Sequence, residues 1–305
     1  MVTKTKETLD KVITLSNNSI DLPRNGVIQN IALLFNVTLS NSGSSAWNGT
    51  LEDVLKAIDE IRVVADANDI KYALSGLDLA IMNYYDSGSK GIDLSQSISV
   101  DASETKEVTF MLFMKSGYIH AVAKESLALS VKFASSVATN VNISNAEVKI
   151  TLDKLLFADA EEWYSYFNGE FIEPKVWTKK ADFSASTEIT EILDIPVGAI
   201  AWRGFITIYD SDGARADIID KYAVMQTKPR RIEVLKVDWK TGQELDKVEY
   251  HLDNVLSGVS IIDYDQEVVD GGLNLITADL GAFKLALKPT SAGSVRYISH
   301  ELVVL

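Results

Sequence analysis

The chain has 305 residues, of which 47% are hydrophobic and 24% charged, the composition of a globular protein long enough for about two domains. It contains no cysteine, which excludes a disulfide framework, a cysteine-based zinc site and a thiol nucleophile. A net charge of −14 opposes binding to a polyanion, so nucleic acid is not an expected partner. No stretch approaches the roughly 18 apolar residues of a membrane span, and the first residues lack a signal-peptide core, so synthesis in the cytosol is expected.

Residues 1–18 are predicted to form a polar N-terminal arm. Three apolar residues of this arm fall on one face at helical spacing: Leu9, Val12 and Ile13. This spacing predicts a terminal helix on the surface of the first domain. An alternative is a tail that reaches a neighbouring subunit or a membrane, with Lys4, Lys6 and Lys11 supplying positive charge.

A repeated pattern organises the rest of the chain. Ile20-Asp21-Leu22-Pro23 precedes a long apolar segment, and Leu193-Asp194-Ile195-Pro196 precedes another. In both copies a glycine and a predicted strand follow the proline. One supersecondary unit used twice gives this kind of self-similarity.

The ends of the two halves match as well. Residues 127–132 resemble residues 283–288, and residues 143–150 resemble residues 298–304. The matches keep their order along the chain while the loops between them differ in length. We therefore predict two similar all-β domains in tandem.

The first domain is predicted to span residues 19–157. Strict alternation of apolar residues from Ile31 to Leu39 predicts a strand with one buried face. Thr50 is positioned to cap a short helix, and a second short helix is predicted after Ser75. The clearest further strands cover residues 61–65, 107–114, 127–133 and 146–152.

Residues 158–182 differ in composition from both halves and are predicted to be a connector. They are rich in aromatic residues: Trp163, Tyr164, Tyr166, Phe167, Phe171 and Trp177. Burial in the seam between two domains is the default expectation for such residues. A surface that stacks a ligand would use the same residue types.

The second domain is predicted to span residues 183–305. Its strands are predicted at residues 199–210, 231–239, 259–262, 273–277, 283–287 and 295–305. Thr241-Gly242 is predicted to be a turn, followed by a helix that carries Leu245 and Val248 and continues to Leu256. This helix is expected to be the counterpart of the helix after Thr50, although its place in the strand order differs.

About eight strands per domain, with antiparallel turn signals, indicate β-sandwiches. The eight-stranded jelly roll is one such sandwich. Strand spacing alone does not separate it from an immunoglobulin-like sandwich.

The sequence offers little catalytic chemistry. His120, His251 and His300 are isolated, and none lies in a metal-binding or catalytic motif. The acidic clusters 210–213 and 263–267 could supply oxygen ligands to calcium, but neither has complete loop spacing, and the first is also a plain turn signal. No phosphate-binding loop or nucleophile elbow occurs. We therefore predict a protein that is not an enzyme, with no catalytic, cofactor-binding or metal-binding residues and no cofactor.

Several segments of the first half resemble one known family. They are residues 21–28 with the strand to Leu39, the helix after Gly49-Thr50-Leu51, residues 61–64, and residues 74–79 with the helix that follows. Over about residues 20–155 the chain is similar to double jelly-roll major capsid proteins of tailless, membrane-containing icosahedral viruses of bacteria and archaea. In the second half, the resemblance rests on the duplication.

The resemblance implies an all-β fold of two tandem eight-stranded jelly rolls with short helices in the loops. It implies assembly of homotrimers with a pseudo-sixfold outline, which tile a virion shell around an internal membrane. Further implied partners are minor capsid and vertex proteins, and a membrane near the N-terminal arm. The acidic charge is compatible with this arrangement because the membrane would separate the shell from the genome.

Two other functions are compatible with tandem β-sandwiches. A carbohydrate-binding protein, such as a lectin or adhesin, would stack sugars on the aromatic connector or loop tips. A carbohydrate-active enzyme would need a carboxylate pair across a concave sheet. The assembly state distinguishes these functions from that of a shell protein, because a stable trimer or larger assembly favours a shell protein.

Overall fold

A computed structural model describes residues 2–88, 90–115, 117–195, 200–228, 231–264 and 282–304. The chain divides into two compact units, and each is described by itself. Unit 1 contains residues 1–174 and 304–305, and unit 2 contains residues 175–303. The division lies inside the range 158–182 that the sequence indicates as a connector.

Unit 1 is built mainly from antiparallel strands. Its strands are β1 (Thr3–Thr8), β2 (Ile13–Thr14), β3 (Ser19–Asp21), β4 (Val27–Asn41), β5 (Trp47–Thr50), β6 (Ile58–Ala65), β7 (Asp69–Leu74), β8 (Ser97–Val100), β9 (Thr105–Met114), β10 (Leu127–Phe133), β11 (Ser136–Ala138) and β12 (Val141–Leu156). Its helices are α1 (Leu51–Lys56), α2 (Gly76–Asp86), the 3-10 turn η1 (Ala121–Ala123) and α3 (Ala160–Tyr166).

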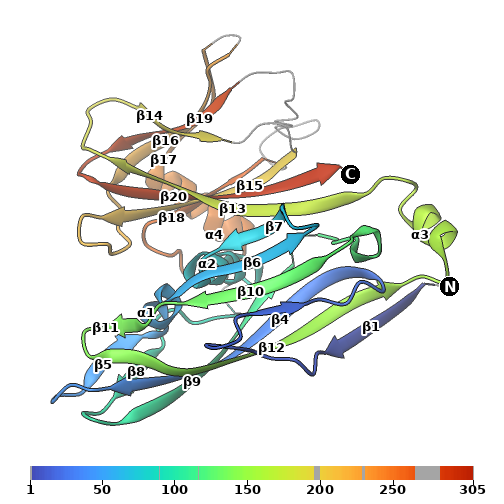
Figure 1. The fold of residues 1–305 in the computed structure, drawn as a ribbon. Coiled ribbons are helices and arrows are strands. Elements are labelled where there is room, and N and C mark those ends of the chain that lie inside the picture. Colours follow the sequence, from blue (N-terminus) through green and yellow to red (C-terminus); the bar gives the residue numbers. More distant parts are fainter. Residues whose placement is uncertain are drawn as a thin grey trace. The chain divides into compact units, whose positions relative to one another are not determined.

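Two sheets of unit 1 enclose its core. One has the order β1-β12-β4-β9, and the other has the order β7-β6-β10-β3. The long strands β4 and β12 run side by side in Figure 1. The predicted buried face of β4 is confirmed, because Ile31, Leu33, Phe35, Val37 and Leu39 are at most 1% exposed. Phe35 stacks on Phe110 of β9, its partner across the strands, with ring centroids 4.9 Å apart.

Unit 2 repeats this construction. The strand β13 (Ile172–Phe183) begins at the end of unit 1 and continues into unit 2. The other elements of unit 2 are β14 (Thr190–Ile195), β15 (Ile200–Asp210), β16 (Ile219–Gln226), β17 (Ile232–Asp238), α4 (Trp239–Glu249), β18 (Val259–Asp263), β19 (Phe283–Pro289) and β20 (Gly293–Val304). Its sheets have the orders β18-β15-β20-β13 and β14-β19-β16-β17.

The strand order is the same in both units. If β13 to β20 are counted from one to eight, the sheets of unit 2 read 1-8-3-6 and 2-7-4-5. In unit 1, the strands β1, β3, β4, β6, β7, β9, β10 and β12 take these eight places and give the same two orders. This strand order, with each sheet drawing strands from both ends of the unit, is that of an eight-stranded jelly roll.

The repeats found in the sequence mark equivalent strands. Asp21 and Asp194 belong to the second strand of each unit, each preceding the long third strand. The later matches fall on the seventh strands, β10 and β19, and on the eighth strands, β12 and β20. The predicted duplication is confirmed. Pro196 to Ala199 and the strand predicted at residues 273–277 lie outside the described residues.

Both short helices predicted in the first half are confirmed. Thr50 begins α1 with a capping box that uses Asp53, and Ser75 begins α2 with one that uses Asp78. In such a box, the side chain of the cap and the acid three residues later each satisfy a backbone N–H group. These local bonds explain why both helices start where the sequence indicates.

Three local predictions are wrong. The terminal helix does not form, because Thr3–Thr8 is strand β1, which pairs with β12 along its whole length. Thr241-Gly242 is not a turn but lies inside α4, which ends at Glu249, before Leu252 and Leu256. The counterpart of α4 is α2 and not the helix after Thr50, because α2 and α4 each lie between the fifth and sixth strands of their units.

Candidate functional site

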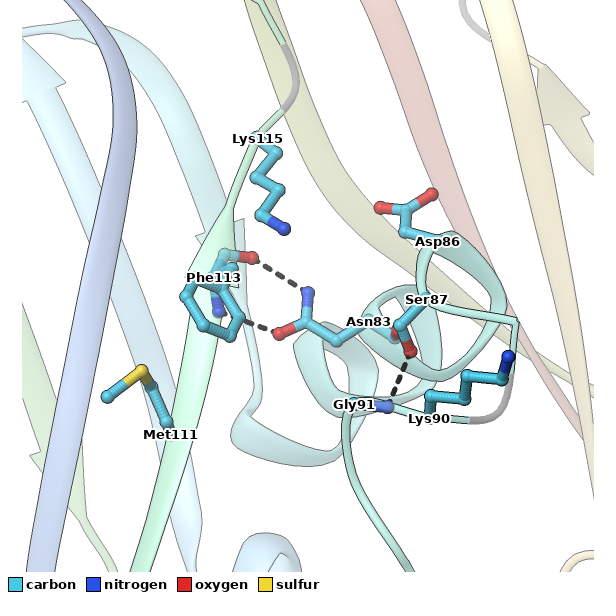
Figure 2. A pocket seen from close by; sticks show the side chains of 8 residues that line it. All are labelled: Asn83, Asp86, Ser87, Lys90, Gly91, Met111, Phe113 and Lys115. Atoms are coloured by element: carbon cyan, nitrogen blue, oxygen red, sulfur yellow. Dashed lines mark hydrogen bonds between the residues drawn. The ribbon is translucent and has the colours of Figure 1, made fainter. Parts of the chain in front are cut away.

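Among the described strands, the sixth strand of each unit lies at the edge of its sheet and leaves backbone groups without a neighbouring strand. In unit 1, Asn83 of α2 supplies that neighbour. Its side-chain oxygen accepts from Phe113 N–H of β9 at 2.6 Å, and its nitrogen donates to the Phe113 carbonyl at 2.7 Å (Figure 2). The amide therefore pairs with the strand edge as a backbone peptide group would.

A small pocket of about 190 Å³ lies beside this contact. It is lined by Asn83, Asp86, Ser87, Lys90, Gly91, Met111, Phe113 and Lys115, all shown in Figure 2. The Lys115 ammonium lies 4.5 Å from the centre of the Phe113 ring, and Gly91 N–H donates to the Ser87 hydroxyl at 2.8 Å. Asp86 is the one carboxylate among the described residues of the lining, so these residues include no pair of acids for acid–base catalysis.

The helix α4 closes the equivalent edge in unit 2. Its Asp246 carboxylate accepts from Ile261 N–H of β18 and from the Ser260 hydroxyl, each at 3.0 Å. Asp246 and Asn83 are both the eighth residue of an eleven-residue helix. The two helices therefore share a register as well as a place in the strand order.

Asp217 fixes the beginning of α4. Its carboxylate accepts from Trp239 Nε1 at 2.8 Å, from Gln243 Nε2 at 2.9 Å and from Gly258 N–H at 2.8 Å. Burial by itself raises the pKa of Asp217, but these hydrogen bonds and one from Ser257 outweigh it and hold the pKa below its usual value. The ionised side chain thus fastens α4 to two loops of unit 2.

A buried group of charges lies where unit 1 ends. Glu173 is fully buried, and its carboxylate pairs with the ammonium groups of Lys71 and Lys124. Lys71 also pairs with Asp69 at 2.6 Å, and the backbone N–H of His120 donates to the Glu173 carboxylate at 2.8 Å. Two cations and two anions balance, which is the condition for keeping charges out of water.

The side chain of His120 lies beside this group. It is fully buried, and its Nδ1 accepts from Trp163 Nε1 at 3.1 Å. Burial lowers the pKa of His120 to about 4, with Lys124 and Lys71 adding to the effect and Glu173 opposing it. His120 is therefore neutral at pH 7 and serves as an acceptor for Trp163.

Most aromatic residues of the predicted connector pack on one another and on His120. Trp163 of α3 stacks on Phe171 with ring centroids 4.3 Å apart, and Phe167 meets His120 edge-on at 4.6 Å. These rings are occupied by protein contacts, which counts against a sugar-stacking role. Tyr164 and Tyr166 remain 60% and 46% exposed.

The other sequence candidates are not brought together. His251 lies in an exposed turn after α4, and His300 is buried in β20. The Asp210 carboxylate accepts from the backbone N–H groups of Asp212 and Ala214 and so closes a turn. Asp263 accepts from the Tyr250 hydroxyl, and residues 265–267 of the second acidic cluster lie outside the described residues.

Within the part of the chain that the structure describes, no three histidine, aspartate or glutamate side chains gather where a metal could bind. None of the helices described is both long and apolar enough to cross a membrane.

No protein-family model matches the chain, and no curated protein matches it. Solved structures of other proteins do match it. The crystal structure of the STIV major capsid protein superposes with a TM-score of 0.86 at 21% identity, over 99% of this chain and 97% of that one. A chain in the atomic structure of Sulfolobus Turreted Icosahedral Virus gives the same TM-score and identity, over 99% of this chain and 91% of that one.

A third similar structure is the major capsid protein P2 of bacteriophage PM2. It has a TM-score of 0.60 at 14% identity and covers 99% of this chain and 98% of that one. The chain has the double jelly-roll fold. The fold predicted from the resemblance is therefore confirmed, and unit 1 and unit 2 are called the first and second jelly rolls below.

Proposed function

We propose that this double jelly-roll protein is a major capsid protein that assembles with copies of itself into the shell of an icosahedral virus. The observation that carries the proposal is the superposition over 99% of the chain on the STIV major capsid protein. Both jelly rolls are included in that match, so little of the chain remains for a separate catalytic domain. The location that follows is the virion shell.

We further propose that the assembling unit is a homotrimer. Two jelly rolls of the same strand order give each chain two similar lobes, and three such chains present six lobes. A pseudo-sixfold outline of this kind can tile a closed shell. The strongly acidic charge supports a shell that does not touch the genome directly, with an internal membrane between them.

A role without catalysis fits the side chains described above. Buried Glu173 is paired with two lysines, buried His120 accepts from Trp163, and the described lining of the Figure 2 pocket holds no second acid. Minor capsid and vertex proteins would be further partners of such a shell. We do not advance the carbohydrate-binding alternative, because Trp163, Phe167 and Phe171 are already stacked within the protein.

The test is the assembly state of the purified protein. Mass photometry should find a species with three times the 33.5 kDa of one chain, and electron microscopy should find closed particles under assembly conditions. A protein that stays monomeric at every concentration and forms no particles contradicts the proposed function. A glycan array and a reducing-sugar assay on the same sample test the lectin and the glycosidase.

A further inference from the structure

The two equivalent helices differ in what lies against them. In the first jelly roll, α1 and the first residue of β6 lie close to the start of α2. A Cβ atom on Gly76 would lie 2.9 Å from the Leu55 carbonyl oxygen of α1 and 2.6 Å from Ile58 Cβ of β6. α1 belongs to the long connection between the third and fourth strands, β4 and β6. The second jelly roll joins β15 to β16 by residues 211–218, which form a turn without a helix.

The shared register allows the outer faces of the helices to be compared residue by residue. Asn83 corresponds to Asp246, so Met82 corresponds to Leu245 and Tyr85 to Val248. Met82 and Tyr85 are each 1% exposed, whereas Leu245 is 56% exposed and Val248 is 74% exposed. The second jelly roll thus leaves two apolar side chains in water at the positions where the first buries them.

The helix that carries these side chains is held firmly from its inner side. Asp217 fixes its first turn, Asp246 fixes its middle, and the Tyr250 hydroxyl just after it donates to Asp263 at 2.8 Å. A groove of about 430 Å³ runs beside its outer face. The groove is lined by Tyr222, Gly242, Leu245, Asp246, Val248, Glu249, His251, Ile261 and Asp263. A rigid apolar ridge next to a groove is suited to contact with another protein.

The charges around the ridge indicate what kind of partner fits. Lys240 and Glu244 are exposed on α4, and Lys247 and Glu249 are half-buried, so the helix surface carries two charges of each sign. An anionic membrane or a nucleic acid would require a basic surface. Copies of a chain with a net charge of −14 repel one another over most of their surface, so they meet most easily at an apolar face with mixed charges.

We propose that the outer face of α4, centred on Leu245 and Val248, is a surface on which a second copy of this chain docks. This inference rests on the proposed shell function and names the face that assembly uses. In this arrangement, the neighbouring copy buries Leu245 and Val248. In the first jelly roll, the chain itself buries the corresponding residues Met82 and Tyr85.

The test compares two double variants with the same added charge. Leu245→Asp with Val248→Asp should raise the dissociation constant of the oligomer by at least about 100-fold, since each carboxylate would be buried without a partner. The control, Leu15→Asp with Val122→Asp, alters two apolar residues that are each 42% exposed on the first jelly roll. The control should assemble like the wild type, and both variants should keep the wild-type melting temperature as monomers.

An introduced thiol gives a second readout, because the chain has no cysteine. In Val248→Cys, maleimide labelling should slow at least about tenfold when the protein is assembled. Equal labelling rates in assembled and dissociated protein overturn the inference. So does assembly of the aspartate variant with wild-type affinity, or equal loss of assembly in the control.

A lower melting temperature in the α4 variant with intact assembly also overturns the inference, because it would show that the same chain covers the face. A wild-type protein that never assembles contradicts the proposed function itself. If the wild type and the α4 double variant both form trimers, only the inference about α4 is contradicted.

Discussion

The two jelly rolls share their strand order but not the surroundings of their helices. In the first, α2 is buried along most of its length and lies against α1. In the second, α4 buries only Trp239, Gly242, Gln243 and Asp246, and its outer apolar residues remain exposed. The difference indicates that duplication preserved the strand framework, while the connections between strands changed what each helix can contact.

The jelly rolls also differ in the carboxylates that tie distant segments together. The first holds Glu173 between two lysines, so its stability depends on balanced ions. The second uses Asp217 and Asp246 as acceptors for backbone and side-chain N–H and hydroxyl groups. Glu173 thus forms ion pairs in the first jelly roll, whereas Asp217 and Asp246 anchor α4 in the second.

The largest expected effect is on the ion group of the first jelly roll. Glu173→Ala should lower the free energy of unfolding by about 3–5 kcal/mol, because Lys71 and Lys124 would remain buried without their shared anion. Urea unfolding measures this effect. A loss below about 1 kcal/mol would show that the group does not stabilise the fold. Glu188→Ala, an exposed acid of the second jelly roll, serves as the control.

Truncating equivalent residues of α2 and α4 tests the contrast between the helices directly. Met82→Ala should cost about 3 kcal/mol of unfolding free energy, because it opens a cavity in a packed region. Leu245→Ala should cost less than about 0.5 kcal/mol in the monomer, because the side chain is largely in water. Equal losses in chemical denaturation would mean that both helices are covered by their own chain.

The pH dependence should reveal the buried histidine of the first jelly roll. The pKa of His120 is about 4 in the folded protein and about 6.5 in the unfolded chain, so the unfolded chain binds more protons at acidic pH. The stabilising effect of neutral His120 is complete above about pH 6.5. It should fall by about 3 kcal/mol as the pH drops from 6.5 to 4.

His120→Gln should remove this part of the pH dependence, as measured by urea unfolding at a series of pH values. His251→Gln changes an exposed histidine of the second jelly roll and serves as the control. An unchanged pH profile in His120→Gln would contradict the neutral state of His120.

The smallest expected effect comes from exchanging the two residues that close the strand edges. Asn83→Asp should cost about 2 kcal/mol, because it replaces the donor to the Phe113 carbonyl by a second oxygen. Asp246→Asn should cost less than about 1 kcal/mol, since an amide oxygen can still accept from Ile261 N–H. Thermal unfolding of both variants measures the difference. A larger loss of stability in Asp246→Asn than in Asn83→Asp would show that the two contacts do not play the same role.

Much of the strand framework could be read from the sequence because it depends on short-range patterns. Alternation from Ile31 to Leu39 identifies a buried strand face, and the capping residues Thr50 and Ser75 mark where α1 and α2 begin. The paired Asp-apolar-Pro segments indicated the duplication because equivalent turns join equivalent strands. The aromatic residues near Trp163 stand out in the sequence as a cluster. The sequence does not indicate that they contact His120.

Other features have no local signature. β1 joins its sheet through backbone hydrogen bonds to β12, which a polar sequence can form as well as an apolar one. Lys71, Lys124 and Glu173 are far apart in the chain, and only the folded strands bring their charges together. Sequence by itself determined which side chains seek burial and that the pattern occurs twice. Tertiary structure decided which of those side chains are buried. Burial depends on connections such as α1, which is present in the first jelly roll and has no counterpart in the described part of the second.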